Sequence, residues 1–328
     1  MRSPARLLPS RALSPSSQAS DTRKLFECAP TVQHVLRMPK RKLEQVKGIS
    51  SAKAEKIQEA ATKLVGTDRS FQTAKDLQAQ RDQNVYRVTT GCVELDEILG
   101  GGVESGSITE LYGEWRCGKT QLCLTLCVTS FLPREVRGGE GRALFLDTEG
   151  TFRPERLGPI AARFELDHDF VMENVVYERI LNCDHLDARL NDAAALFADE
   201  ETNGPFRVLV VDSIIAPFRQ EFPGRGELAE RQQRIGAAMA QLKIISEVFN
   251  VAVIITNQVT ADPGAAAAFV ADPKKAVGGN IIAHISDTRL SLRKGKGEQR
   301  VCKVVDSPMM PEAEATFAIS PGGITNAE

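Results

Sequence analysis

The chain has 328 residues, 42% hydrophobic and 26% charged, which is enough for one large globular domain and a small one. Because 41 Lys and Arg nearly balance 43 Asp and Glu, the net charge of −2 excludes a basic field over the whole molecule, and any nucleic-acid surface must be a local patch. Seven scattered cysteines without a CxxC pair indicate reduced thiols, and no apolar run approaches the roughly 18 residues of a membrane span, so we expect no membrane partner.

The first 24 residues, 1–24, are predicted to form a disordered arm. Residues 1–20 contain Arg2, Arg6 and Arg11, six serines and no acidic residue. The same composition fits an organellar transit peptide, and a wrongly assigned start site would also produce it. The sequence leaves these alternatives open.

Residues 25–66 have the pattern of a small helical domain. Two short helical stretches, 41–46 and 51–57, flank a turn centred on Gly48, and Ser50 stands where the cap of the second helix belongs. This order predicts a helix-hairpin-helix unit, which can offer backbone N–H groups to a DNA phosphate. A purely structural or protein-docking role fits the same pattern.

Residues 67–84 are predicted to be a polar linker between this unit and a large domain. The linker contains Phe71 and Ala74. A Phe in such a segment either packs locally or anchors the chain to another surface. The residues alone favour local packing.

Residues 85–328 alternate apolar runs with helical stretches. Three of the runs are apolar almost throughout, namely 142–146, 207–211 and 251–255. Strands that are buried on both faces and separated by helices indicate a mostly parallel, twisted sheet in a doubly wound α/β domain. Two more polar stretches, 288–292 and 300–305, are predicted to be edge strands in a hairpin around Gly295 and Gly297.

One stretch matches the phosphate-loop pattern G-x-x-x-x-G-K-[ST] at every fixed position. Its residues are Gly113, Glu114, Trp115, Arg116, Cys117, Gly118, Lys119 and Thr120, followed by Gln121. An apolar run precedes the loop and a helix-prone run follows it. In this order of strand, glycine loop and helix, backbone N–H groups and the helix dipole attract phosphate. Lys119 would then reach the β- and γ-phosphates of a nucleotide, and the Thr120 hydroxyl would ligate Mg²⁺.

Three apolar strands end in polar residues, and in an α/β sheet such strand ends meet at the edge where ligands bind. Asp212 ends one of these strands and fits a second Mg²⁺ contact beside Thr120. Glu149 is the candidate that orients and deprotonates an attacking water. Gln258 is the candidate sensor of the γ-phosphate, because its amide both donates and accepts hydrogen bonds. Each of them alone also fits a structural role.

Two flexible stretches, 218–231 and 260–279, leave the same edge. The first carries Arg219, Arg225 and Arg231 among glycines, which suits a phosphate backbone. The second combines aliphatic residues with an aromatic side chain, which can wedge between bases or stack on them. The pair predicts a DNA-binding surface, with solvated loops as the alternative.

Together these features resemble a eukaryotic strand-exchange recombinase of the RecA/RadA family. The resemblance covers about residue 31 to the C-terminus and rests on the stretches 113–121, 147–156, 224–232, 271–275 and 306–308. Two further stretches, 260–264 and 228–233, favour the meiosis-specific member over its somatic sister. The resemblance implies a RecA-like P-loop ATPase core that uses ATP and Mg²⁺ to form filaments on single-stranded DNA and pair it with homologous double-stranded DNA.

The resemblance also implies roles for individual residues. Glu149 matches the water-activating glutamate of the family, Asp212 the metal-site aspartate and Gln258 the nucleotide-sensing glutamine. Phe71 and Ala74 match the F-x-x-A element by which one protomer adds a strand and an anchor to its neighbour, which reverses the preference for local packing. The residues on the two DNA-binding loops are Arg225, Arg231, Pro263, Gly264 and Phe269. The residues that face the ATP of an adjacent protomer are His284, Asp306 and Pro308.

The family pattern further implies a nuclear homo-oligomer, filamentous on DNA and ring-shaped when free, that works with recombination mediators. The sequence departs from this pattern at Trp115, where Phe is usual, and at Ala276, where Pro is usual. It also departs before about residue 29, where the first helices of the N-terminal domain are not recognisable.

Two alternatives stay open. One is a recombination paralogue that acts as a non-catalytic mediator or scaffold, and the other is a hexameric RecA-fold helicase or regulator.

Overall fold

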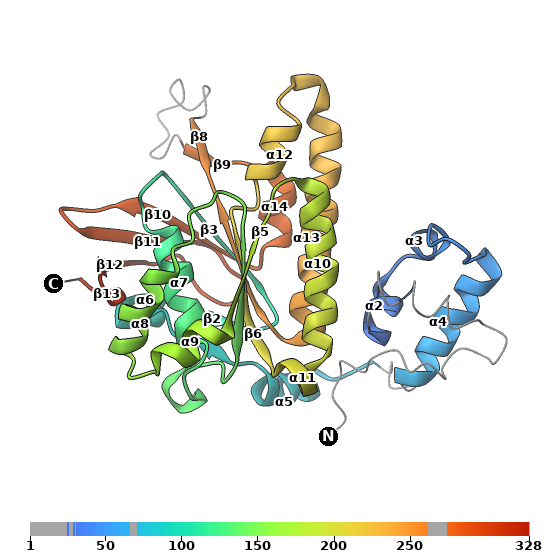
Figure 1. Cartoon of the computed structure of the whole chain (residues 1–328), viewed down its shortest axis with the longest axis horizontal. Helices are drawn as coiled ribbons and strands as arrows, with labels where there is room; N and C mark the ends of the chain where they lie inside the picture. The colour runs from blue at the N-terminus through green and yellow to red at the C-terminus, as the bar shows by residue number, and fades with distance from the viewer. Residues whose placement is uncertain (1–24, 26–28, 30, 66–70, 262–273, 328) are drawn as a thin grey trace.

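The computed structural model of the chain describes residues 25, 29, 31–65, 71–261 and 274–327. Figure 1 shows a small helical unit beside a larger unit in which helices cover both faces of a central sheet. The predicted arm, 1–24, lies outside the described residues. None of the described helices combines the length and the apolar character needed to cross a membrane.

The small unit consists of short helices around their own apolar cluster. Its helices are α2 (Val32–Arg37), α3 (Lys40–Glu44) and α4 (Ser51–Val65). Thr31 caps α2 by accepting a hydrogen bond from the His34 N–H at 3.2 Å, and Gly48, with φ of 100°, makes the left-handed turn between α3 and α4. The buried residues of the cluster are Leu25, Ala29, Val32, Val35, Leu43, Ile49, Ala54, Ile57 and Ala61.

The small unit contacts the large one through helix α13 (Leu228–Phe249). The His34 ring lies 5.6 Å from the Phe249 ring, and Arg37 forms an ion pair with Glu247. One aromatic contact and one surface ion pair therefore join the two units here.

The predicted linker contains a helix, α5 (Ala74–Asn84), where a polar connector was expected. Thr73 and Asp76 form a capping box at its start, with Thr73 Oγ1 accepting from the Asp76 N–H at 3.2 Å. None of the α5 residues is buried, so the sequence carries no amphipathic pattern that would have revealed the helix. Phe71, just before it, is fully exposed and does not pack locally.

Within the described residues, nine strands form one sheet in the order β13-β12-β11-β10-β3-β7-β6-β4-β5. The pairs from β10 to β5 are parallel and the other three are antiparallel, which confirms the mostly parallel α/β sheet expected from the sequence. The strands are β3 (Ile108–Gly113), β4 (Arg142–Asp147), β5 (Val175–Arg179), β6 (Phe206–Asp212), β7 (Ala252–Asn257), β10 (Thr288–Lys294), β11 (Gln299–Asp306), β12 (Glu314–Ser320) and β13 (Gly323–Asn326). Two small sheets pair β1 (Arg87–Val88) with β2 (Val103–Glu104) and β8 (Val259–Ala261) with β9 (Lys274–Ala276).

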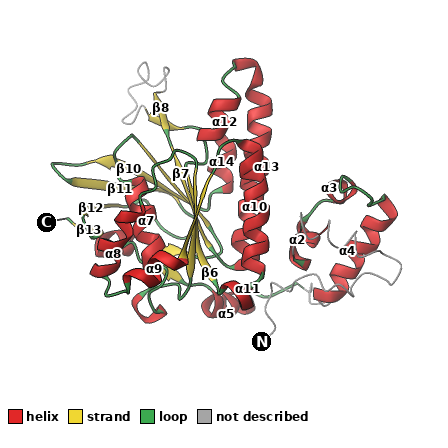
Figure 2. Ribbon diagram, in the orientation of Figure 1, coloured by secondary structure: helices red, strands yellow, loops and turns green. Residues whose placement is uncertain are grey.

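Helices cover the sheet on both faces, as Figure 2 shows. One face packs against α6 (Val93–Ile98), α7 (Lys119–Thr129), α8 (Leu157–Arg163) and α9 (His168–Asn174). The other packs against α10 (Cys183–Ala198), α12 (Ala216–Glu221), α13 and α14 (Gly279–Ile285). Shorter helical segments are α11 (Glu200–Asn203), η1 (Arg134–Val136), η2 (Pro154–Arg156) and η3 (Arg225–Glu227). Two apolar clusters, one on each face, make up the core of the large unit.

The position of β10 and β11 differs from the sequence prediction. They form the expected hairpin, but β10 pairs in parallel with β3 and β11 pairs with β12, so neither is an edge strand. The edges of the sheet are β13 and β5. Because β5 is short and has no long apolar run, the pattern of hydrophobic residues did not reveal it.

Candidate active site

The phosphate-loop residues connect β3 to α7 and leave a backbone cradle. A Cβ atom on Gly113 would lie 2.2 Å from the carbonyl oxygen of Leu292, and Gly118 has φ of 100°. Both positions therefore require glycine. Helix α7 starts at Lys119, so its first N–H groups point out of the helix end toward the cradle, where they can bind an anion.

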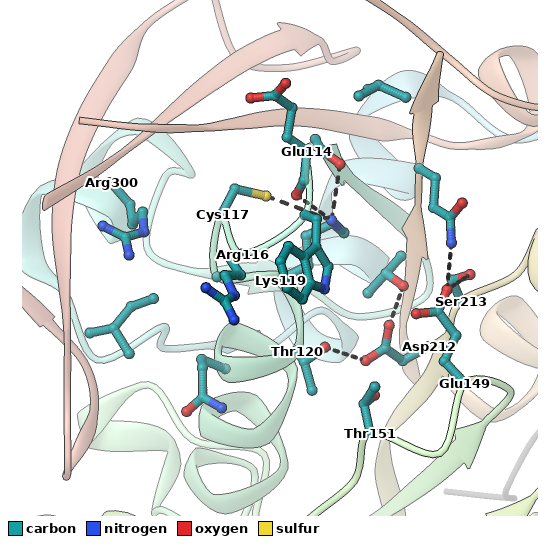
Figure 3. Close-up of a pocket in the computed structure, with 18 residues that line it drawn as sticks. Glu114, Arg116, Cys117, Lys119, Thr120, Glu149, Thr151, Asp212, Ser213 and Arg300 are labelled. Atoms are coloured by element: carbon teal, nitrogen blue, oxygen red, sulfur yellow. Dashed lines mark hydrogen bonds between the residues drawn. The ribbon is translucent and has the colours of Figure 1, made fainter. Parts of the chain in front are cut away.

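A cavity of about 640 Å³ lies over this cradle and gathers most of the predicted catalytic and nucleotide-binding residues. Figure 3 shows Thr120 near Asp212, with Glu149 and Ser213 on the same side and Arg300 on the opposite side. The lining residues are the eight of the loop, Gln121, Glu149, Thr151, Asp212, Ser213, Thr256, Gln258, Val259, Arg300 and Ile319.

Thr120 and Asp212 form a donor set that fits Mg²⁺. The Thr120 hydroxyl donates to Asp212 Oδ2 at 2.6 Å, and the Thr256 hydroxyl donates to Asp212 Oδ1. Burial raises the pKa of the Asp212 carboxyl above its usual value, and these two hydrogen bonds act in the opposite direction. A hydroxyl and a carboxylate beside a phosphate cradle are the oxygen ligands that Mg²⁺ takes together with nucleotide phosphates.

Glu149 lies at the wall of the cavity and accepts two hydrogen bonds on the same oxygen. Ser213 Oγ donates to Glu149 Oε1 at 2.9 Å, and Gln258 Nε2 donates to it at 2.7 Å. Two donors fix the direction of the carboxylate, which general-base chemistry on a bound water requires. Three strand ends, those of β4, β6 and β7, contribute to this arrangement.

Three other side chains of the phosphate loop differ in burial and in their partners. Lys119 Nζ donates to the carbonyls of Gly113 at 3.0 Å and Glu114 at 2.9 Å, within the loop. Burial raises the pKa of the Cys117 thiol, and the nearby Lys119 charge opposes this. Trp115 is 76% exposed, with the Arg116 guanidinium 4.0 Å from its ring.

The candidate DNA-binding residues are described only in part. Arg219, on α12, donates from Nη1 to Gln258 Oε1 at 2.6 Å. Arg231, near the start of α13, donates to the Phe222 carbonyl at 3.5 Å, and Arg225 begins η3. The residues of the second loop, Pro263, Gly264 and Phe269, lie outside the described residues, between the paired strands β8 and β9.

The residues expected to face a neighbouring protomer do not line the cavity of their own protomer. His284 on α14 is exposed, as are Asp306, the last residue of β11, and Pro308, which follows the strand. Phe71 is fully exposed, and Ala74 begins α5. The fold therefore separates these residues from the phosphate loop of the same chain.

Several residues that shape the site were not singled out from the sequence. Ser213 and Thr256 belong to the polar strand ends expected at this edge, but no individual role was predicted for them, and the structure shows that they donate to Glu149 and Asp212, respectively. Arg300 and Ile319 carry no local signal, because they reach the cavity only through the pairing of β11 with β12 beside the phosphate loop.

The chain is similar to known recombination proteins over most of its length. The family model described as Rad51 matches residues 80–327. The chain is 52% identical over 298 residues to the mouse protein named "Meiotic recombination protein DMC1/LIM15 homolog", with 91% of this chain and 86% of the mouse protein covered. The human protein of the same name gives the same values. A rice protein, "Meiotic recombination protein DMC1 homolog B", is 49% identical over 323 residues, which cover 97% of this chain and 90% of the rice protein.

Proposed function

Because the chain belongs to the Rad51 family, we propose that it is an ATP-dependent DNA recombinase that acts in meiosis. In this proposal it forms filaments on single-stranded DNA and catalyses homologous pairing and strand exchange in the nucleus, assisted by recombination mediators. About half of its residues are identical to those of relatives named as meiotic recombination proteins in mammals and in rice. The family model matches residues 80–327, which include nearly all of the predicted ATPase core.

The proposed nucleotide is ATP with Mg²⁺, bound in the cavity over the phosphate loop. The glycine cradle and the free end of α7 suit the phosphates, and Lys119 is the cation that contacts the β- and γ-oxygens. Thr120 and Asp212 would hold the metal, which would supply positive charge to the phosphate oxygens. Gln121 lines the same cavity and would contribute to binding of the nucleotide.

Glu149 is proposed to be the general base of hydrolysis. It accepts the proton of the water that attacks the γ-phosphorus, while Gln258 and Ser213 hold its carboxylate in place. Gln258 also serves as the γ-phosphate sensor, because its amide nitrogen is already turned toward the cavity wall that Glu149 occupies.

One observation carries the link between ATP and DNA. Arg219, from the stretch predicted to bind DNA, donates to Gln258, and Gln258 donates to Glu149. This series of hydrogen bonds joins the proposed DNA surface to the proposed general base without a gap. Such a connection offers a physical route by which bound DNA and bound ATP can each change the affinity for the other.

Self-assembly is proposed to use residues 71–74 and the edge strand β5. An edge strand offers unpaired backbone groups to an added strand, and exposed apolar side chains, Tyr177 and Leu181, lie on and beside β5. The exposed Phe71 is a suitable anchor for this edge on a second copy. His284, Asp306 and Pro308 would then face the ATP that the neighbouring protomer holds.

The test is a strand-pairing assay with the full-length protein, single-stranded DNA and a labelled homologous duplex. We expect joint molecules only with ATP and homology, and none with Lys119→Ala. A heterologous duplex is the matched control for homology. Filaments without joint molecules would instead identify a mediator or scaffold, and closed rings on DNA in electron micrographs would identify a helicase-like assembly.

A further inference from the structure

Asp147, the last residue of β4, is fully buried, and its carboxylate accepts hydrogen bonds from the backbone that follows it. Oδ1 accepts from the N–H groups of Glu149 at 2.9 Å, Gly150 at 2.7 Å and Thr151 at 3.3 Å. Oδ2 accepts from the N–H of Phe152 at 3.1 Å. One side chain therefore organises the whole turn in which Glu149 lies.

Two side chains of the edge strand β5 complete the surroundings of this carboxylate. Arg179 Nη1 lies 3.2 Å from Asp147 Oδ1 and 3.1 Å from the Asp147 carbonyl oxygen. The Tyr177 hydroxyl donates to Oδ2 at 3.4 Å. Burial and the charge of Asp147 raise the pKa of Tyr177 above its ordinary value, at which the hydroxyl is already protonated at neutral pH. Every partner of the carboxylate is thus a donor, and one of them carries a positive charge.

The turn matters because Glu149 enters the cavity from it. Asp147 and Asp212 are directly opposite one another on neighbouring strands, so the turn begins beside the proposed metal ligand. Gly150 has φ of 76°, and the chain turns sharply after Glu149. The donors to the Glu149 carboxylate, Ser213 and Gln258, belong to other strand ends and can meet it only if its backbone is held where it is.

We propose that Asp147 is a positioning residue for Glu149 in ATP hydrolysis, with Arg179 as its charged partner. The proposal rests on the proposed function, because it assigns to Asp147 the task of holding the general base of that reaction. Asp147 does not line the cavity, so it acts through Glu149 and not on the nucleotide itself.

The first test replaces Asp147 by Asn. The amide has one oxygen, and its NH₂ group faces a donor wherever it points, so the turn loses at least one of its backbone hydrogen bonds. We expect kcat for ATP hydrolysis to fall by roughly 100-fold, as displacement of a reacting group by about 1 Å does, with KM for ATP within twofold of the wild type. Amide hydrogen exchange should become faster at residues 149–152.

A double variant separates positioning from general damage to the fold. If Asp147 acts through Glu149, adding Asp147→Asn to Glu149→Gln should change the residual rate less than twofold. A further fall by the same factor as in the wild-type background would overturn the proposal. So would a single Asp147→Asn variant whose kcat stays within twofold of the wild type.

Arg179→Gln is the second variant, and it decides the question if Asp147→Asn does not fold. Arg179 is partly exposed, so the substitution leaves the apolar core unchanged. We expect a kcat about 10-fold below the wild type at unchanged KM. Arg189→Gln on α10 removes an arginine of similar exposure that lies neither on β5 nor in the cavity lining, so it is the control and should leave kcat unchanged. If the kcat of the Arg179 variant equals that of this control, the proposed role of Asp147 and Arg179 is overturned. If the wild-type chain does not hydrolyse ATP, the proposed function is overturned as well.

Discussion

His34 should make the stability of this protein fall between neutral and mildly acidic pH. Its ring is 5% exposed, lies 3.0 Å through Nδ1 from Thr31 Oγ1, and packs on the Phe249 ring of the large unit. Among the described residues, its Nε2 atom is buried without a hydrogen-bond partner. Burial, and to a smaller extent the charge of Arg37, lowers the pKa of His34 from 6.5 to about 4.

The sign of the effect follows from which state binds the proton. Below about pH 6.5 the unfolded chain protonates His34 while the folded chain does not, so the free energy of unfolding falls as the pH drops toward 4. The complete shift corresponds to about 3 kcal/mol, and about 2 kcal/mol of it is lost between about pH 7 and about pH 5. Above the unfolded-state pKa of 6.5, His34 is neutral in both states, and its full contribution to the free energy of unfolding is present.

The perturbation is His34→Gln, which cannot titrate in this range. Urea unfolding followed by far-UV circular dichroism gives the free energy of unfolding of both proteins at the two pH values. We expect the wild type to lose about 2 kcal/mol more than the variant, since the titration of all other groups cancels in the comparison. Parallel losses in the two proteins, or an NMR titration of His34 near its ordinary pKa, would refute the reasoning.

Three further substitutions test the proposed function. Lys119→Ala should weaken ATP binding by roughly 100-fold, because it removes a charge-assisted contact to the phosphates, and calorimetry with the magnesium nucleotide measures the change. Phe71→Glu should prevent filament growth while leaving the folded protomer intact, and unchanged sedimentation beside the wild type would remove the anchor role. Arg225→Ala should lower DNA affinity and reduce the salt slope of binding by about one, with ATP affinity intact. An unchanged salt slope would contradict the assignment of that loop.

The phosphate loop could be predicted from the sequence because its chemistry is local. Glycines, Lys119 and Thr120 within one short stretch specify a cradle, a cation and a hydroxyl, whatever the rest of the chain does. The apolar strands were predictable for a similar reason, since burial on both faces leaves a continuous run of apolar residues. Because parallel strands share one ligand edge, Asp212, Glu149 and Gln258 could be expected near the loop, and all three line the cavity.

Elements with little burial left no such pattern. Helix α5 is exposed all round, and β5 is a short edge strand, so neither has the period of hydrophobic residues that identifies an element. Both elements lie at exposed surfaces. Helix α5 follows the exposed Phe71, and β5 forms an edge of the sheet. The order of strands across the sheet decides that β5 is an edge strand, and the hydrophobic pattern within a single strand carries no information about that order.

The sequence by itself determined the nucleotide loop, the kind of sheet and the polar strand ends, because each depends on neighbours in the chain. Only the tertiary structure decided which of those polar groups meet. Asp147 and Glu149 lie two residues apart, yet one is buried among backbone donors and the other lines the cavity. Arg219, Gln258 and Glu149 come from three separate segments and form one series of hydrogen bonds. Such contacts depend on strand order and on the direction of each side chain, which long-range packing sets.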